Sequence, residues 1–144
     1  MTERTIRQII EGQELLTAPS SLTVTEAARL MKARNGGALM VVDDGKLVGM
    51  FTERDALFRV LAAGLDGNAT TLAAVMTANP QTISPDRSFT HALGFMREGH
   101  FRILPVVEDG RPIGIISVRD AMGPELEAFV YEMLRQEQVS NILA

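Results

Sequence analysis

Two segments of the 144-residue sequence end in a hydroxyl residue that is followed three positions later by aspartate. The first pair is Thr52 and Asp55, and the second is Ser117 and Asp120. An aspartate carboxylate at the start of a helix can accept charge-assisted hydrogen bonds from two neighbouring sugar hydroxyls. The same spacing is also a helix-capping motif, in which the acid binds only backbone N–H groups. The residues alone leave both interpretations open.

Other polar residues favour structural roles. Asp43 and Asp44 could form a catalytic carboxylate pair, but their position beside Gly45 favours a turn. His91 and His100 lack His-x-x-x-His spacing, and the chain has no cysteine, so no metal site is expected. An enzyme would need a nucleophile activated by a positioned base, and no motif supplies one. We therefore expect a protein that is not an enzyme and has no cofactor.

The two hydroxyl-to-aspartate motifs belong to an internal duplication. Gly49 aligns with Gly114, and the same offset aligns 17–56 with 82–121 without a gap. In each copy, two apolar runs are separated by Asp-Gly, which predicts a β-hairpin. Glycine in the second run suggests that a ligand or another backbone comes close to it. Because units this short cannot each bury a core, we expect one pseudo-symmetric domain.

Capping signals place the helices inside each repeat. One helix is expected between Thr23 and Gly36, and its second copy between Ser88 and Gly99. Each helix is preceded by a brief extended segment, and a further helix should follow Asp55. Each repeat therefore has the order strand, helix, strand, strand, helix, and the fold class is α+β.

Apolar residues at helical spacing flank the duplication. Residues 2–12 are predicted to form a short amphipathic helix outside the duplicated part, with Ile6, Ile9 and Ile10 on one stripe. A tail helix from Pro124 places an apolar stripe at 126–134. Such stripes require a partner surface, so we expect a homodimer; the alternative is that both helices fold back onto their own domain. The expected boundaries are 1–14 (N-terminal helical segment), 15–66 (first repeat), 67–80 (linker, helical at 72–76), 81–123 (second repeat) and 124–144 (C-terminal helix).

Composition bounds the class of protein. With 46% hydrophobic residues, the chain fits one globular domain of common size. A net charge of −4 argues against a nucleic-acid partner. No apolar run is long enough to span a membrane, and the first residues lack a signal-peptide core, so we expect a cytoplasmic protein without a membrane partner.

Taken together, these motifs resemble a tandem pair of CBS (cystathionine β-synthase) domains. The family pattern is Gly, two apolar residues, Thr or Ser, two variable residues and Asp, and it is matched at 49–55 and 114–120. Leu-Pro-Val-Val at 104–107 also fits, as does Val-Met-Thr-Ala-Asn-Pro at 75–80. The resemblance covers about 15–122.

The resemblance implies that two pseudo-symmetric repeats pack strand face to strand face. Two clefts would then bind adenosine-containing ligands such as AMP, ADP, ATP or S-adenosylmethionine, and the pair would act as a regulatory sensor. The alternative is a structural dimerisation module with degenerate pockets. The implied ribose-binding residues are Thr52, Asp55, Ser117 and Asp120. The implied adenine walls are Thr17, Ala18, Leu39, Met40 and Val41, or Thr82, Ile83, Ile103, Leu104 and Pro105; Met40 departs from the family pattern, which has the proline seen at Pro105.

The resemblance also implies that the two clefts differ. Basic residues before the hairpin reach the phosphates held by the other repeat, so Arg102, helped by His100, would serve the cleft of Asp55. The second cleft would face Gly37 and lack that charge. Arg54 and Arg119 are further candidates for phosphate contacts, although both could be ordinary surface charges. We therefore expect a phosphorylated adenosine to prefer the Asp55 cleft.

Overall fold

The first repeat is built on a four-stranded sheet in the computed structural model, which describes residues 4–143. Its spatial order is β1 (Thr17–Ala18), β2 (Ala38–Asp43), β3 (Lys46–Thr52) and β4 (Thr77–Ala78), with β1 parallel to β2 and the other pairs antiparallel. Because side chains alternate along a strand, Leu39 and Val41 enter the core while Met40 faces the other repeat.

The second repeat contains the two-stranded sheet of β5 (Ile103–Glu108) and β6 (Arg111–Ser117). Ile83 adds a single parallel bridge to Val106, where β1 pairs with β2 in the first repeat. The same alternation places Leu104, Val106 and Ile116 in a second core. The duplication therefore appears as two cores, one in each repeat, and the expectation that units this short cannot each bury a core was wrong.

Both predicted hairpin turns are confirmed. Asp44 and Gly45 have φ of 52° and 77°, and Asp109 and Gly110 have φ of 54° and 78°, the left-handed pair that a type I′ turn needs. Asp43 accepts hydrogen bonds from the N–H (3.0 Å) and hydroxyl (2.6 Å) of Ser20, which lower its pKa. The Asp43–Asp44 pair therefore shapes a turn.

The helices α2 (Val24–Arg34) and α5 (Phe89–Gly99) begin at the predicted caps. The Thr23 hydroxyl accepts from the N–H of Glu26 at 3.2 Å, and the Ser88 hydroxyl accepts from that of His91 at 3.1 Å. Both helices end in a left-handed residue that is not glycine, namely Asn35 (φ 50°) and His100 (φ 58°). These ends place His100 and the following loop next to the first repeat.

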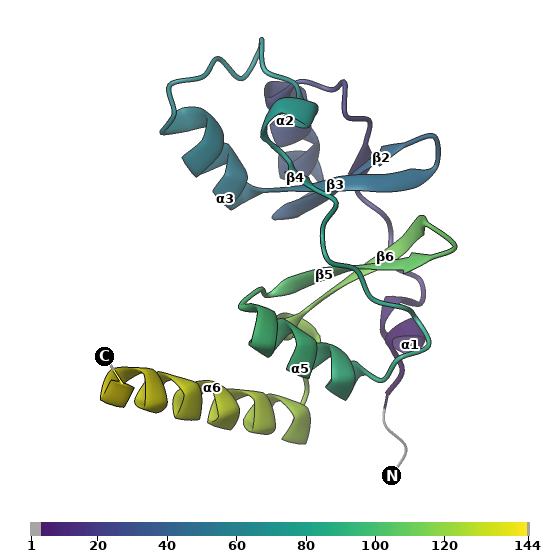
Figure 1. Ribbon diagram of the computed structural model, residues 1–144. Helices are drawn as coiled ribbons and strands as arrows, with labels where there is room; N and C mark the ends of the chain where they lie inside the picture. The colour runs from purple at the N-terminus through teal and green to yellow at the C-terminus, as the bar shows by residue number, and fades with distance from the viewer. Residues whose placement is uncertain (1–3, 144) are drawn as a thin grey trace.

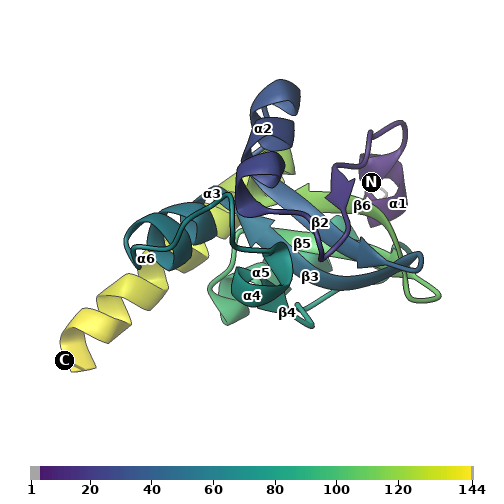
Figure 2. The ribbon, with the colours of Figure 1, turned by 90° about the horizontal axis from the view of Figure 1, so that it is seen from above.

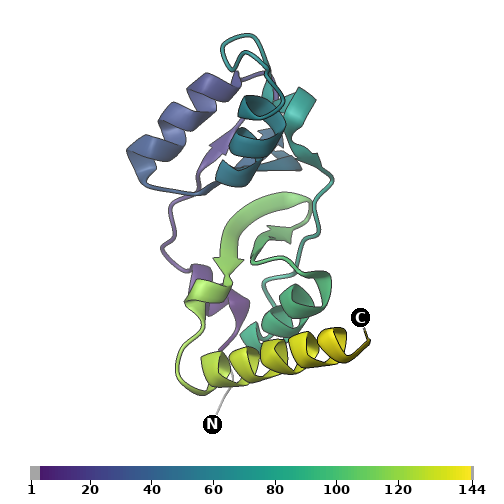
Figure 3. The same ribbon diagram turned by 90° about the vertical axis from the view of Figure 1, so that its left-hand side faces the viewer.

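The two repeats stack with their sheets face to face and their helices outside (Figures 1 and 3). Strand β3 contacts β6, and the N–H of Leu47 donates to the carbonyl of Gly110 at 3.3 Å. The arrangement confirms the predicted α+β fold class with two packed repeats. It also brings the end of β3 close to the start of β5, so that residues from both repeats can line one cavity.

The N-terminal helix α1 (Ile6–Ile10) belongs to the second repeat. Ile6 and Ile10 are 0% and 7% exposed and pack in the second core, as Leu72 of α4 (Leu72–Val75) does in the first. The residue before each helix makes the same bridge, Thr5 to Ser88 and Thr71 to Thr23. The expectation that this helix lies outside the duplication was wrong, because α1 is the structural counterpart of α4.

The strand glycines leave room for protein side chains. A Cβ at Gly49 would lie 2.4 Å from Sδ of Met76, and one at Gly114 would lie 2.7 Å from Cβ of Ile10. The close approach predicted from these glycines is therefore made by the segments around α4 and α1. Neither glycine lines the cavities described below.

The side chain of Gln13 completes the exposed edge of β6. Its amide donates to the carbonyl of Ile115 at 2.9 Å and accepts from the N–H of Ile115 at 2.7 Å. In the first repeat, β4 pairs with the equivalent position of β3 through backbone. The amide of Gln13 thus satisfies the backbone groups that an unpaired edge would leave open.

Gln13→Ala is expected to lower the free energy of unfolding by about 1 kcal/mol, because two solvent-accessible hydrogen bonds are lost. Urea unfolding followed by circular dichroism measures the change. Glu11→Ala is the control, since Glu11 is an exposed neighbour without such a contact. Equal stability of Gln13→Ala and the wild type would contradict this role for the amide.

The helices that follow the two motifs differ. Helix α3 (Glu53–Asp55) continues into η1 (Ala56–Leu61), a π-helical segment, whereas η2 (Val118–Asp120) is a single 3₁₀ turn followed by α6 (Pro124–Leu143). Arg4 pairs with Glu125 at the start of α6 and lowers the pKa of that carboxyl. Helix α6 packs on α5 and extends outward beyond the repeats toward the C-terminus (Figures 1 and 2).

Candidate ligand-binding clefts

The first hydroxyl-to-aspartate motif forms a capping box at the start of α3. Oδ2 of Asp55 accepts from the N–H of Thr52 at 2.9 Å and from its hydroxyl at 3.1 Å. The Thr52 hydroxyl accepts in turn from the N–H of Asp55 at 3.2 Å. Oδ1 of Asp55 lies 3.5 Å from Nε of Arg59. Asp55 therefore caps the helix as the second interpretation predicted. The capping hydrogen bonds use its Oδ2, whereas Oδ1 makes its only ion pair or hydrogen bond within residues 4–143 with Arg59.

The second motif is capped in a similar way. Oδ2 of Asp120 accepts from the N–H of Ser117 at 2.8 Å, and the Ser117 hydroxyl accepts from the N–H of Arg119 at 3.1 Å. The carbonyl of Asp120 also accepts from Arg4 at 2.9 Å. Both aspartates therefore lie at helix starts and are part-buried, as the motif predicts.

A cavity of about 530 Å³ lies between the repeats beside the first motif. Its volume is in the usual range for sites that bind small molecules. The first repeat contributes Thr52 and Asp55, and the second contributes residues of the loop before β5 and of its first strand positions. The lining residues are Gly37, Met50, Thr52, Glu53, Arg54, Asp55, Thr77, Pro80, Gln81, His100, Phe101, Arg102, Ile103, Leu104 and Pro105.

The predicted basic residues occur together in this cavity, which we call the Asp55 cleft. Exposed His100 and Arg102 come from the second repeat and line the same cavity as Asp55. Arg54 also lines it, with its guanidinium 5.1 Å from the centre of the Phe58 ring. Sequence reasoning missed Glu53, a carboxylate in the same lining, because its counterpart in the second repeat is the apolar Val118.

The predicted adenine walls divide into cavity-lining and core residues. Ile103, Leu104 and Pro105 line the Asp55 cleft. Leu104 also packs in the second core. Four others are buried in the cores and line none of the three cavities described here: Ala18, Leu39, Val41 and Ile83. Thr17 and Thr82 are exposed and line neither this cleft nor the two smaller cavities described next. Met50, Pro80 and Gln81 were not predicted from the sequence and lie in the wall instead.

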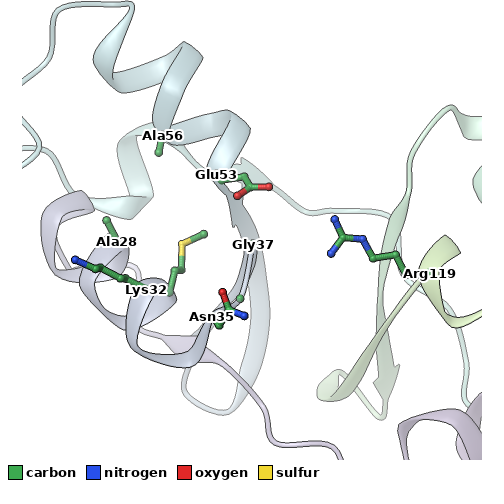
Figure 4. Close-up of a pocket in the computed structure, with 9 residues that line it drawn as sticks. Ala28, Lys32, Asn35, Gly37, Glu53, Ala56 and Arg119 are labelled. Carbon is green, nitrogen blue, oxygen red and sulfur yellow. The ribbon is translucent and has the colours of Figure 1, made fainter.

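The pseudo-symmetric cleft is smaller. A cavity of about 230 Å³ contains Met40 and Ile115 with residues of the N-terminal segment, but neither Ser117 nor Asp120 lines it. Arg119 lines a separate pocket with Gly37 (Figure 4). The two clefts are therefore unequal in size and lining. Gly37, which was expected in the second cleft, lines the Asp55 cleft and the pocket of Arg119 instead, and the smaller cavity contains the charged residues Glu14 and Arg34.

The part of the chain that the structure describes lacks two kinds of feature. No group of three or more His, Asp or Glu side chains is placed to hold a metal ion among residues 4–143. No helix among the same residues is both long and apolar enough to cross a membrane.

Comparison with known families identifies the fold. The family model described as "CBS domain" matches 6–62 and 72–123, one match for each repeat. The chain belongs to the CBS domain family. The first match begins at α1, the helix that packs in the second repeat. The chain is thus a tandem CBS pair, as the repeated motifs indicated.

Individual CBS proteins support this conclusion. The chain is 36% identical over 107 residues to the CBS domain-containing protein YhcV of Bacillus subtilis, covering 74% of this chain and 76% of that protein. It is 38% identical over 117 residues to the CBS domain-containing protein CBSCBSPB3 of Arabidopsis thaliana, covering 81% of this chain but 21% of the relative, so the chain spans about a fifth of that longer protein. A CBS-domain containing protein of Agrobacterium tumefaciens has a TM-score of 0.73 at 30% identity, covering 86% of this chain and 98% of that one. CBS pairs are commonly regulatory modules, and that class fits this chain.

Proposed function

We propose that the Asp55 cleft binds an adenosine phosphate and that the CBS pair regulates a partner activity in response. The observation that supports the proposal is a single cavity that gathers Thr52 and Asp55 from one repeat with His100 and Arg102 from the other. A carboxylate for ribose hydroxyls and a guanidinium for phosphate are the charge-assisted contacts that such a ligand needs. The candidate ligands are AMP, ADP, ATP and S-adenosylmethionine.

Each part of the ligand has a proposed position. The adenine would lie against Ile103 and Pro105, with Met50 on the opposite repeat. The ribose hydroxyls would donate to Asp55, whose carboxylate has more acceptor positions than the capping box uses. The phosphate would accept from Arg102, which has no ion pair within 4 Å in residues 4–143.

Arg59 connects the proposed ribose site at Asp55 with the segment between the two repeats. Its Nε lies 3.5 Å from Oδ1 of Asp55, and its Nη1 donates to the carbonyls of Val75 and Met76 at 3.2 Å each. A ribose that binds Oδ1 would compete with Arg59 for that oxygen. Ligand binding would thereby alter the contact between η1 and the segment that carries α4, which is the kind of shift a sensor requires.

A thermal-shift screen tests the proposal against the alternative of a dimerisation module with degenerate pockets. AMP, ADP, ATP, S-adenosylmethionine, NAD and GMP would each be added at up to millimolar concentration. At least one adenosine phosphate is expected to raise the melting temperature by several degrees, because a ligand that binds only the folded state stabilises it. GMP is the matched control for the base. No shift with any adenosine compound would favour the degenerate-pocket alternative.

We further propose that no catalysis takes place in the cleft and that the protein acts in the cytoplasm. Neither His91 nor His100 makes a side-chain hydrogen bond within residues 4–143, so no activated hydroxyl nucleophile is formed with them. The ligand would therefore leave the cleft unchanged. Recovery of intact AMP after prolonged incubation is the expected result.

A homodimer is the proposed assembly, with α6 as the contact. The predicted apolar stripe of α1 cannot contact a second protomer, because Ile6 and Ile10 are buried in the chain's own core. On α6, by contrast, Val130 and Leu134 are 45% and 54% exposed. Adjacent exposed apolar side chains of this kind are typical of interaction surfaces.

Light scattering coupled to size-exclusion chromatography is expected to return a dimer at micromolar concentration. Val130→Glu should shift the protein to a monomer, because it places an unpaired charge in the contact. Arg135→Glu, an exposed charge reversal on the same helix, is the control. A wild-type monomer at that concentration would rule out the proposed assembly.

A further inference from the structure

A second polar pocket lies beside the Asp55 cleft. It has a volume of about 470 Å³ and is bounded by α2 and α3 of the first repeat and by Arg119 of the second (Figure 4). It shares Gly37 and Glu53 with the Asp55 cleft, but neither Ser117 nor Asp120 lines it. We call it the Glu53–Arg119 pocket. Its lining residues are Ala28, Met31, Lys32, Asn35, Gly36, Gly37, Glu53, Ala56 and Arg119.

Two opposite charges face each other across this pocket. The carboxylate of Glu53 and the guanidinium of Arg119 point toward one another from opposite repeats (Figure 4). Within residues 4–143, neither side chain makes a hydrogen bond or an ion pair within 4 Å. The pocket volume of about 470 Å³ leaves room for a small group that contacts both charges. Arg54, the counterpart of Arg119, instead stacks on Phe58.

The local backbone holds Glu53 at the pocket. Its N–H donates to the carbonyl of Gly37 at 3.0 Å, and its Oε1 lies 3.2 Å from where a Cβ of Gly37 would be. Any side chain at position 37 would press on the carboxylate. In the second repeat the equivalent residues are Arg102 and Val118, so this placement of an acid is specific to the first repeat.

The rest of the lining combines polar and apolar groups. Asn35 offers an amide that can both donate and accept, and Figure 4 shows it on the first-repeat side of the pocket, across from Arg119. Ala28, Met31 and Ala56 supply apolar surface on the side of the first repeat. Lys32 extends away from Arg119 (Figure 4).

We propose that the Glu53–Arg119 pocket binds a free apolar α-amino acid, which would bridge the two repeats. The ammonium group binds Glu53, the carboxylate binds Arg119, and the side chain lies on Met31, Ala28 and Ala56. In this pocket an anion alone would satisfy only Arg119, and a cation alone would satisfy only Glu53. A zwitterion satisfies both charges at once. The pocket is distinct from the Asp55 cleft although Gly37 and Glu53 line both, and the proposal does not require that an adenosine phosphate binds in that cleft.

The test is an NMR titration of the ¹⁵N-labelled full chain with L-alanine, L-valine, L-leucine and L-methionine, each added separately. At least one should produce saturable shifts in the amide signals of Lys32, Asn35 and Ala56, which line this pocket and neither of the other two cavities. Glu53→Gln and Arg119→Gln should each weaken that binding by about 10- to 150-fold, since each removes one charge-assisted contact. Arg29→Gln, on the same helix α2 but outside the pocket, should leave it unchanged.

Analogues of the amino acid separate the two charges. For an L-leucine ligand, leucinamide lacks the carboxylate and 4-methylpentanoate lacks the ammonium, and both should bind at least about 10-fold more weakly. The proposal is overturned if no amino acid gives saturable shifts, or if binding survives both glutamine variants. It is also overturned if AMP shifts these signals and competes with the amino acid for the pocket.

Discussion

Asp55→Ala is expected to weaken AMP binding by about 100-fold or more. Two ribose hydroxyls lose a charged acceptor, and each charge-assisted hydrogen bond contributes about 1.5–3 kcal/mol.

Arg102→Ala should weaken AMP binding by about 10- to 150-fold, because one such contact to the phosphate is lost. Adenosine, which lacks the phosphate, should bind the wild type and Arg102→Ala equally. Isothermal titration calorimetry of the three proteins with both ligands measures these differences.

Asp120→Ala is the matched control for the loss of Asp55. Both aspartates accept a backbone hydrogen bond at a helix start, so both alanine variants lose a cap. Only Asp55 lines the larger cleft. If Asp120→Ala abolishes the tight site while Asp55→Ala and Arg102→Ala leave it intact, the assignment of the cleft is wrong.

Ile6→Ala is expected to lower the free energy of unfolding by about 2–5 kcal/mol, the usual range for emptying a fully buried aliphatic site. Ile6 is 0% exposed and packs in the second core, although it lies before the first repeat in sequence. Leu72→Ala should cost a similar amount, because Leu72 has the equivalent place in the first core. Urea unfolding monitored by circular dichroism gives both values.

A control for Ile6→Ala lies on the same helix, α1. Ile9 is only partly buried at the margin of the second core, so Ile9→Ala should cost less than Ile6→Ala. A loss below about 0.5 kcal/mol for Ile6→Ala, the range of ordinary surface substitutions, would show that α1 does not complete the second core.

The features that sequence predicted well are local ones. Asp-Gly between apolar runs specifies a type I′ turn because both residues must adopt positive φ, and 44–45 and 109–110 do so. The caps at Thr23 and Ser88 depend only on residues within one turn of helix. The capping boxes at Asp55 and Asp120 are equally local.

The features that sequence missed depend on tertiary contacts. Helix α1 shares little beyond apolar character with α4. The sequence therefore gives no clear sign that α1, which precedes the first repeat, packs in the core of the second repeat. Leu39 and Val41 were assigned to a ligand wall, yet strand alternation places them in the core. The need for glycine at position 114 depends on Ile10, which is distant in sequence and occupies the space where a Cβ would lie.

A crystal structure of the wild-type protein grown with saturating AMP tests the central claim most directly. The expected result is AMP in the cavity between the repeats, with its ribose on Asp55 and its phosphate on Arg102. AMP bound only at Ser117 and Asp120, or clefts without AMP at millimolar concentration, would contradict the account.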